Sequence, residues 1–262
     1  MIKLGCIGFG AMGSALVEGF IRTGLLPNQI LVYDLSKIAC KKAQEVGCQV
    51  VHSLIDLEEC DMVLLAIKPQ SLDELAKEWP FKEMTVVSIL AGISINQLEQ
   101  SLSTQKVVRV MPNLPAQIGK GVMAVCFSQA ISEDIKQTIK DLLRGSGFYW
   151  ELEEKHFNTV TALSGSSPAF FLLVLEAMVF GGVSEGLNSQ IALEMVAHTM
   201  IGTAEYLLTE NKHPAEIRDL ITSPAGTTAA GIMVLEEKGV RAAISSAIKA
   251  ATQRGKELSE GD

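Results

Sequence analysis

The sequence lacks a metal-ligand pattern and a disulfide framework, and it has few aromatic residues. The four histidines form no paired pattern, so we expect no metal site. The five cysteines are an odd number without metal-site spacing, which favours reduced thiols in a cytoplasmic protein. Aromatic residues make up 5% of the 262 residues and hydrophobic residues 48%, which is typical of a globular chain rather than a fibrous or disordered one.

The chain also lacks a basic run and a long uncharged apolar segment. It carries 30 acidic and 22 basic residues, so we expect no non-specific binding of nucleic acid. The longest apolar run, 169–183, contains Glu176 and is too short to span a bilayer, which predicts a buried helix and no membrane partner. No basic and apolar leader precedes the first strand, so export is not expected.

The first part of the chain alternates between strand and helix patterns. Apolar runs with strand character occur at 2–7, 30–33, 49–52, 62–67, 85–90, 106–110, 122–126 and 148–152. Segments of helical period lie between several of them, and this alternation predicts a mostly parallel, doubly wound Rossmann-like sheet. No strand pattern follows Leu152. We therefore expect an α/β dinucleotide-binding domain at 1–153 and an all-α domain at 154–262.

A Gly-x-Gly-x-x-Gly motif joins the first strand to a helix expected at 14–23. Gly8 permits the tight turn, Gly10 lets bare backbone approach a pyrophosphate, and Gly13 lets the helix pack closely on the strand. The N-terminus of that helix offers N–H groups to phosphate charge. An ordinary Gly-rich turn is the alternative, but the flanking strand and helix favour a dinucleotide site.

The second strand ends at an acidic residue. Asp34 has the spacing of a carboxylate that accepts a hydrogen bond from the adenosine ribose, which favours NAD. Ser36 and Lys37 follow directly and suit a 2′-phosphate instead, and Asp34 also suits the cap of the next helix. The sequence leaves the choice between NADH and NADPH open.

Later strands end in segments that place backbone beside a ligand at the carboxyl edge of the sheet. Lys68-Pro69 forms a stiff loop, and Ala91-Gly92 allows close approach. Asn113 lies between two prolines, in a rigid loop that suits the orientation of a nicotinamide, although a strand-ending turn explains the same residues.

The helical half contains two serine-rich segments that read as helix starts. In 164–169, Ser167 has the position of an N-cap and Pro168 that of the first helical residue. Segment 223–228 is similar, and both suit a small anionic substrate. The helix expected at 169–175 has no polar face, so a partner subunit or the core of its own domain must cover it. No nucleophile elbow, Walker loop or obvious general base occurs, so we expect a cofactor to supply the chemistry.

Four segments in register carry a family resemblance: 66–70 (Ala-Ile-Lys-Pro-Gln), 109–116, 164–169 and 223–228, the last followed by Val-Leu-Glu at 234–236. With them the chain resembles the pyrroline-5-carboxylate reductase family over nearly its whole length. The resemblance implies cytoplasmic reduction of L-1-pyrroline-5-carboxylate to L-proline with NADPH or NADH, the last step of proline biosynthesis. It also implies a helical domain that intertwines with a partner subunit, in homodimers that often form decamers.

The resemblance assigns site residues to positions of this chain. The implied coenzyme-binding residues are Gly8, Gly10, Ala11, Met12, Gly13, Asp34, Ser36, Ser53, Ala66, Ile67, Lys68, Pro69, Ala91 and Gly92. Asn113 is expected to join them because its rigid loop suits the orientation of a nicotinamide. For the substrate, the resemblance implies the 223–228 segment, here Gly226, Thr227 and Thr228. The serine-rich character of 164–169 adds Ser166, Ser167 and Pro168 as expected substrate-binding residues. Thr228 is implied as the catalytic residue near the ring nitrogen.

The chain departs from the family pattern at three positions. Ala11 replaces an asparagine, Leu114 a threonine, and Ala225 the first glycine of a pair. The methyl group of Ala225 opposes a positive φ beside the expected carboxylate site. Two alternatives stay open: an NAD(P)-dependent reductase of another cyclic imine or a hydroxy acid, and a non-catalytic, NADP-binding regulatory paralogue.

Overall fold

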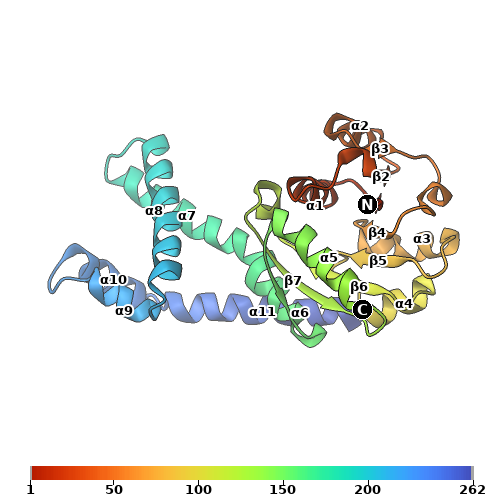
Figure 1. Cartoon of the computed structure of the whole chain (residues 1–262). Coiled ribbons are helices and arrows are strands. Elements are labelled where there is room, and N and C mark those ends of the chain that lie inside the picture. Colours follow the sequence, from red (N-terminus) through yellow and green to blue (C-terminus); the bar gives the residue numbers. More distant parts are fainter. Residues whose placement is uncertain (1, 261–262) are drawn as a thin grey trace. The chain divides into compact units, whose positions relative to one another are not determined.

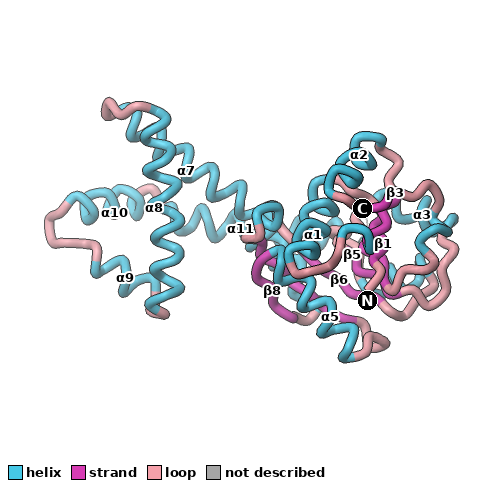
Figure 2. Tube along the Cα trace, turned by 45° about the horizontal axis from the view of Figure 1, so that its top comes forward, coloured by secondary structure: helices cyan, strands magenta, loops and turns pink. Residues whose placement is uncertain are grey.

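A computed structural model describes residues 2–260 of the chain (Figure 1). The chain divides into two compact units, and each is described by itself. Of the described residues, 2–166 and 251–260 form the first unit, and Ser167–Ala250 form the second. Strands occur only in the first unit, and the described residues after 152 contain none (Figure 2). This agrees with the strand-free second half expected from the sequence.

An eight-stranded sheet forms the centre of the first unit. Its strands are β1 (Leu4–Ile7), β2 (Ile30–Tyr33), β3 (Gln49–Val50), β4 (Met62–Leu65), β5 (Thr85–Ser88), β6 (Val107–Met111), β7 (Gly121–Phe127) and β8 (Gly147–Glu151). They lie in the order β3-β2-β1-β4-β5-β6-β7-β8. All neighbours are parallel except β6 and β7, which pair antiparallel. The predicted mostly parallel, Rossmann-like sheet is confirmed.

Helices cover both faces of this sheet. They are α1 (Ala11–Arg22), α2 (Lys37–Val46), α3 (Leu72–Glu78), α4 (Ile95–Leu102) and α5 (Glu133–Leu143). One apolar cluster joins the strands to α1, α2 and α5, and a second joins them to α3 and α4. The two clusters explain why β1 and β4, buried along their whole length, read as unbroken apolar runs.

A continuous helical stretch leaves the sheet after β8. Helix α6 (Phe157–Val160) passes without a break through a π-helical turn, Thr161–Ser166, into α7 (Ser167–Ser184). The helix start expected at Ser167 and Pro168 is therefore wrong, because the chain is already helical there. Pro168 lies inside the stretch, and no free helix N-terminus exists at this point.

The second unit consists of helices. After α7 come α8 (Ser189–Glu210), α9 (Pro214–Leu220), α10 (Thr227–Glu237) and α11 (Val240–Glu260), the last of which ends in the first unit. The buried helix expected at 169–183 is wrong for the single chain, because Phe171, Leu173 and Phe180 are 60%, 68% and 74% exposed. The helical stretch 154–184 is long and apolar enough to cross a membrane by length and composition alone. Only 6% of its apolar 18-residue segment is buried in the structure.

Candidate functional site

The glycine turn after β1 is built by close backbone contacts. Gly8 has φ +92°, and a Cβ there would lie 2.6 Å from the carbonyl oxygen of Ala66. A Cβ on Gly13 would collide with the carbonyl oxygen of Gly8. Both positions therefore require glycine, since any side chain would push β1, β4 and α1 apart. The expected roles of Gly8 and Gly13 correspond to these contacts.

The N-terminus of α1 is open towards solvent. The helix begins at Ala11 rather than at residue 14, with Gly10 as its N-cap and no side chain capping the first turn. A Cβ on Gly10 would meet nothing within 4 Å. Because the first N–H groups of a helix lack helical acceptors and carry partial positive charge, this turn fits the pyrophosphate of a dinucleotide.

Asp34 links the glycine turn to the loop after β2. One carboxylate oxygen accepts a hydrogen bond from the Phe9 N–H at 2.6 Å, and the other accepts from the Ser36 N–H at 2.7 Å. Ser36 in turn caps α2 with its side chain. Asp34 therefore holds the turn and its own negative charge at the edge where a ribose is expected, and each oxygen keeps a lone pair for a hydroxyl donor.

The other predicted coenzyme residues follow the carboxyl ends of parallel strands. Ser53 follows β3, Ala66, Ile67, Lys68 and Pro69 follow β4, and Ala91 and Gly92 follow β5. The Ala66 N–H donates to the Ile7 carbonyl at 2.8 Å, which fixes this loop beside the glycine turn. Gly92 has φ +79°. The fold thus brings the glycine motif, Asp34 and these loops to one edge, and together they fit a dinucleotide.

Asn113 follows β6 and uses both ends of its amide within the protein. Its Nδ2 donates to the Ser164 carbonyl at 2.9 Å, and its Oδ1 accepts from the Val122 N–H at 2.8 Å. The residue is 7% exposed. Contact between Asn113 and a nicotinamide stays a prediction, and in this structure the amide joins the strand end to the π-helical turn.

The second serine-rich segment lies in the second unit, at the start of α10. Gly226 is the N-cap without a side-chain cap, and Thr227 and Thr228 form the first helical residues. Ala225 adopts φ +58°, so the left-handed conformation is taken despite the methyl group. A Cβ on Gly226 would collide with the Ser223 Oγ. The helix start expected here is confirmed, and its open N–H groups suit an anion.

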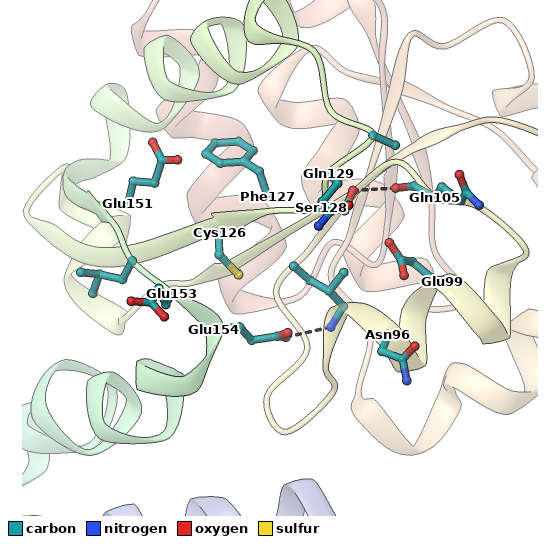
Figure 3. A pocket seen from close by; sticks show the side chains of 13 residues that line it. Asn96, Glu99, Gln105, Cys126, Phe127, Ser128, Gln129, Glu151, Glu153 and Glu154 are labelled. Carbon is teal, nitrogen blue, oxygen red and sulfur yellow. Dashed lines mark hydrogen bonds between the residues drawn. The ribbon is translucent and has the colours of Figure 1, made fainter.

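A cavity of about 830 Å³ lies elsewhere in the first unit, between the start of α4 and the ends of β7 and β8 (Figure 3). It contains none of the predicted site residues. Three of its four carboxylates face basic side chains: Glu151 pairs with Lys140, Glu153 with Lys155 and Glu154 with Arg109. Most of the negative charge of the cavity is therefore neutralised by ion pairs within the protein.

Glu154 was not identified from the sequence, although its side chain connects β6 to the start of α4. One of its oxygens lies 2.8 Å from Arg109 Nη1 and also accepts from the Ile95 N–H at 2.8 Å. Arg109 is the one charged residue of β6 and is buried, and its guanidinium lies 4.8 Å from the centre of the Phe157 ring. A charge in an apolar strand signals that a carboxylate partner is required, but it does not say which of the 30 acids provides it.

Four of the five cysteines, Cys6, Cys48, Cys60 and Cys126, are buried. All five are free thiols. Burial raises the pKa of Cys48 and of Cys60 to about 11, and burial together with the charge of Glu154 raises the pKa of Cys126 to about 12. These thiols are protonated at neutral pH, and a protonated thiol is a poor nucleophile. Among the described residues, no group of His, Cys, Asp and Glu side chains suits a metal ion.

A mostly parallel sheet with a glycine turn, an open helix N-terminus and a carboxylate after β2 defines a class, the Rossmann-type oxidoreductases that use a nicotinamide dinucleotide. Residues 3–92 match the family "NADP oxidoreductase coenzyme F420-dependent", and residues 154–258 match "Pyrroline-5-carboxylate reductase dimerisation". The pyrroline-5-carboxylate reductases of Pisum sativum and Methanosarcina acetivorans are 35% and 38% identical to the chain. The alignments cover 98% of this chain and 96% and 97% of those proteins. The chain belongs to the pyrroline-5-carboxylate reductase family.

Solved structures of the family have the same fold. A Plasmodium falciparum pyrroline carboxylate reductase with NADP bound matches with a TM-score of 0.88 at 28% identity, covering 98% of each chain. The enzyme of Streptococcus pyogenes also gives 0.88, at 34% identity, covering 97% of this chain and 98% of its own.

Proposed function

We propose that the chain catalyses the reduction of L-1-pyrroline-5-carboxylate to L-proline with NADPH or NADH. The observation that carries this proposal is the full-length relationship to the reductases, combined with an intact glycine turn at the sheet edge. The chain is an NAD(P)H-dependent oxidoreductase acting on a C=N bond. A nicotinamide coenzyme held at this edge would provide the hydride for reduction of the imine carbon.

The residues at the edge of the first unit hold the coenzyme in this proposal. The open first turn of α1, from Gly10 to Gly13, binds the pyrophosphate, and Asp34 and Ser36 lie beside the adenosine ribose. The loops at Ser53, 66–69 and 91–92 flank the remainder. Asp34 repels a 2′-phosphate, whereas Lys37, at the first position of α2, attracts one.

The first turn of α10 binds the substrate carboxylate. Its N–H groups, from Gly226 to Thr228, stabilise a negative charge without adding a fixed positive charge, which suits a substrate whose ring nitrogen becomes cationic. Ser166, Ser167 and Pro168 complete the substrate-binding set. Thr228 donates or accepts a hydrogen bond at the ring nitrogen. Its hydroxyl is too weak an acid to protonate the imine, so the proton arrives with the substrate or from water.

The helical unit is the dimerisation domain in this proposal, with the functional boundary at 153/154. Two observations support a second copy as the cover of α7: the matched dimerisation family, and the exposure of the large apolar side chains of α7 in the single chain. A homodimer that assembles further into a decamer in the cytoplasm completes the proposal.

The decisive experiment follows the absorbance of the reduced nicotinamide with pyrroline-5-carboxylate, in parallel with NADH and NADPH. Other cyclic imines and hydroxy acids serve as comparison substrates. The proposal expects the highest kcat/KM for pyrroline-5-carboxylate. Faster turnover of a hydroxy acid would assign a different substrate, and coenzyme binding without turnover of any imine would indicate a regulatory paralogue.

Thr228→Ala tests the assigned hydroxyl. We expect kcat to fall roughly 10- to 100-fold, which corresponds to the loss of about 1.5–3 kcal/mol for one hydrogen bond to a charged group. Thr228→Ser keeps the hydroxyl and is the matched control. An alanine variant with unchanged turnover would remove the assignment.

A further inference from the structure

The π-helical turn at 161–166 has a cause in the sequence of the helix itself. Pro168 has no N–H, and in an α-helix its ring clashes with the carbonyl of the residue four positions earlier. That residue is Ser164, which is 9% exposed and lies within the turn. An α-helical path through this stretch would therefore leave the Ser164 carbonyl buried without its helical donor, which is costly in a folded protein.

Asn113 supplies a donor for this carbonyl. Its Nδ2 lies 2.9 Å from the Ser164 oxygen, and its Oδ1 is fixed by the Val122 N–H at 2.8 Å. The amide is thus bonded at one end to Val122, near the start of β7, and at the other to the π-helical turn. Because the Asn113 side chain is buried and both ends of its amide are hydrogen-bonded, it fixes the π-helical turn relative to the sheet.

A second contact joins the same two segments. Met111, the last residue of β6, lies against Gly165, where an added Cβ would be 3.3 Å from the Met111 Cε. Adjacent residues of the turn, Ser164 and Gly165, therefore meet the end of β6 and the loop that follows it. The contact of Asn113 with the turn belongs to a packed junction and is not an isolated hydrogen bond.

We propose that Asn113 is a positioning residue for the substrate. Its amide holds the π-helical turn in place, and this turn gives Ser166 a position around the helix axis that an α-helical turn would not give. A π-helical turn contains one more residue than an α-helical turn, and its loss turns the residues that follow by about 100° around the helix axis. The inference rests on the proposed function, in which Ser166 binds the substrate. Asn113 acts through the turn and not by touching the coenzyme.

The test compares Asn113→Ala, Pro168→Ala and the variant with both changes. For Asn113→Ala we expect kcat/KM for pyrroline-5-carboxylate to fall roughly 10- to 100-fold, as for other small misplacements of binding groups, while the Kd for NADPH changes less than about threefold. The double variant restores an N–H at position 168 that bonds to the Ser164 carbonyl in an α-helical turn. We expect it to regain Tm but to have a lower kcat/KM than Pro168→Ala alone, which lacks the proline but keeps the Asn113 amide. Asn28→Ala, at an exposed position of the 3-10 helix Pro27–Gln29, is the matched control.

Three results would overturn the proposal. An Asn113→Ala protein with wild-type kcat/KM removes the role. A rise in the NADPH Kd by the same factor as the loss of kcat/KM assigns Asn113 to direct coenzyme contact. A double variant that regains Tm and has the same kcat/KM as Pro168→Ala alone would leave the amide with a purely structural role.

Hydrogen exchange of residues 157–170 gives a readout that does not depend on turnover. We expect protection in the π-helical turn to fall in Asn113→Ala and to return in the double variant. If the wild-type protein reduces no imine, the proposed function fails while this result still stands. If protection is unchanged in Asn113→Ala, the positioning role fails whatever the substrate proves to be.

Discussion

At the scale of single residues, the carboxylate of Asp34 has two tasks. It accepts hydrogen bonds from the Phe9 and Ser36 N–H groups, and it places a negative charge where the adenosine ribose is expected. The first task affects both coenzymes alike, whereas the second opposes only the coenzyme with a 2′-phosphate. The ratio of the two coenzyme activities therefore isolates the charge.

We predict that Asp34→Asn raises the ratio of kcat/KM with NADPH to kcat/KM with NADH by about tenfold, or about 1.4 kcal/mol. Steady-state kinetics with each coenzyme measures it. Glu58→Gln removes an equal charge from an exposed position of the same unit and is the control. A ratio that stays at the wild-type value would show that the carboxylate does not face the ribose.

Ala225 is strained by its own backbone. Its φ of +58° lies in the left-handed region, which costs a residue with a Cβ roughly 1–2 kcal/mol. We predict that Ala225→Gly raises the free energy of unfolding by about 0.5–1 kcal/mol, because the strain relieved exceeds the added entropy of the unfolded chain. Denaturant unfolding at fixed protein concentration measures this change.

Ala229→Gly is the control for Ala225→Gly, because it makes the same chemical change within α10. There the change is expected to lower the free energy of unfolding by about 0.5–1 kcal/mol. If both variants were destabilised equally, the strain at position 225 would not exist in solution.

At the scale of elements, the turn between β1 and α1 depends on a contact with β4. Gly8 and Gly24 both have positive φ, at +92° and +104°, but a Cβ on Gly8 would meet the Ala66 carbonyl whereas one on Gly24 would meet nothing within 4 Å. Alanine at either position lowers the stability of the fold, because a positive φ is unfavourable for a residue with a Cβ. Only at position 8 does it also displace the loop after β4.

We predict that Gly8→Ala weakens NADPH binding more than about tenfold, because the loops that surround the coenzyme must move apart. Gly24→Ala is expected to lose about 1 kcal/mol of stability and to keep the wild-type Kd. NADPH fluorescence titration and thermal unfolding distinguish the two effects. Equal loss of binding in both variants would attribute the effect to backbone strain alone.

The positions of most helices and strands were predictable from the sequence, because they depend on the pattern of neighbouring residues. Strands such as β1 and β4 are buried on both faces, so they appear as unbroken apolar runs bounded by turns. The start of α7 was not predictable in the same way. Ser167-Pro168 has the pattern of a helix N-terminus, but the Asn113 side chain, 51 residues before Ser164, satisfies the carbonyl that Pro168 leaves without a donor.

At the scale of the whole molecule, the apolar surface of α7 is the main feature that the single chain does not explain. Leu173 is 68% exposed, and α7 has one buried residue, Ser167. The chain matches a reductase dimerisation family in this region. We therefore expect a second copy of the chain to cover the apolar face of α7.

We predict that Leu173→Glu shifts the protein from dimer to monomer, weakening association more than tenfold, because the charge would be buried in the interface. Sedimentation or light scattering over a range of concentrations measures it. Ile118→Glu, at a 77% exposed position of the first unit, is the control and is expected to remain dimeric. A wild-type protein that is monomeric in buffer and partitions into lipid vesicles would contradict the dimer and favour a membrane contact.

The sequence by itself determined the elements of the sheet, the coenzyme turn and the family, because these depend on neighbouring residues: alternation of apolar runs, glycine spacing, and short motifs in order. Only the tertiary structure decided which groups bond across long separations. It showed that Asp34 holds the Phe9 N–H, that Glu154 neutralises Arg109, and that Asn113 holds the π-helical turn. Such partners are selected by distance in space, which the order of residues along the chain does not contain.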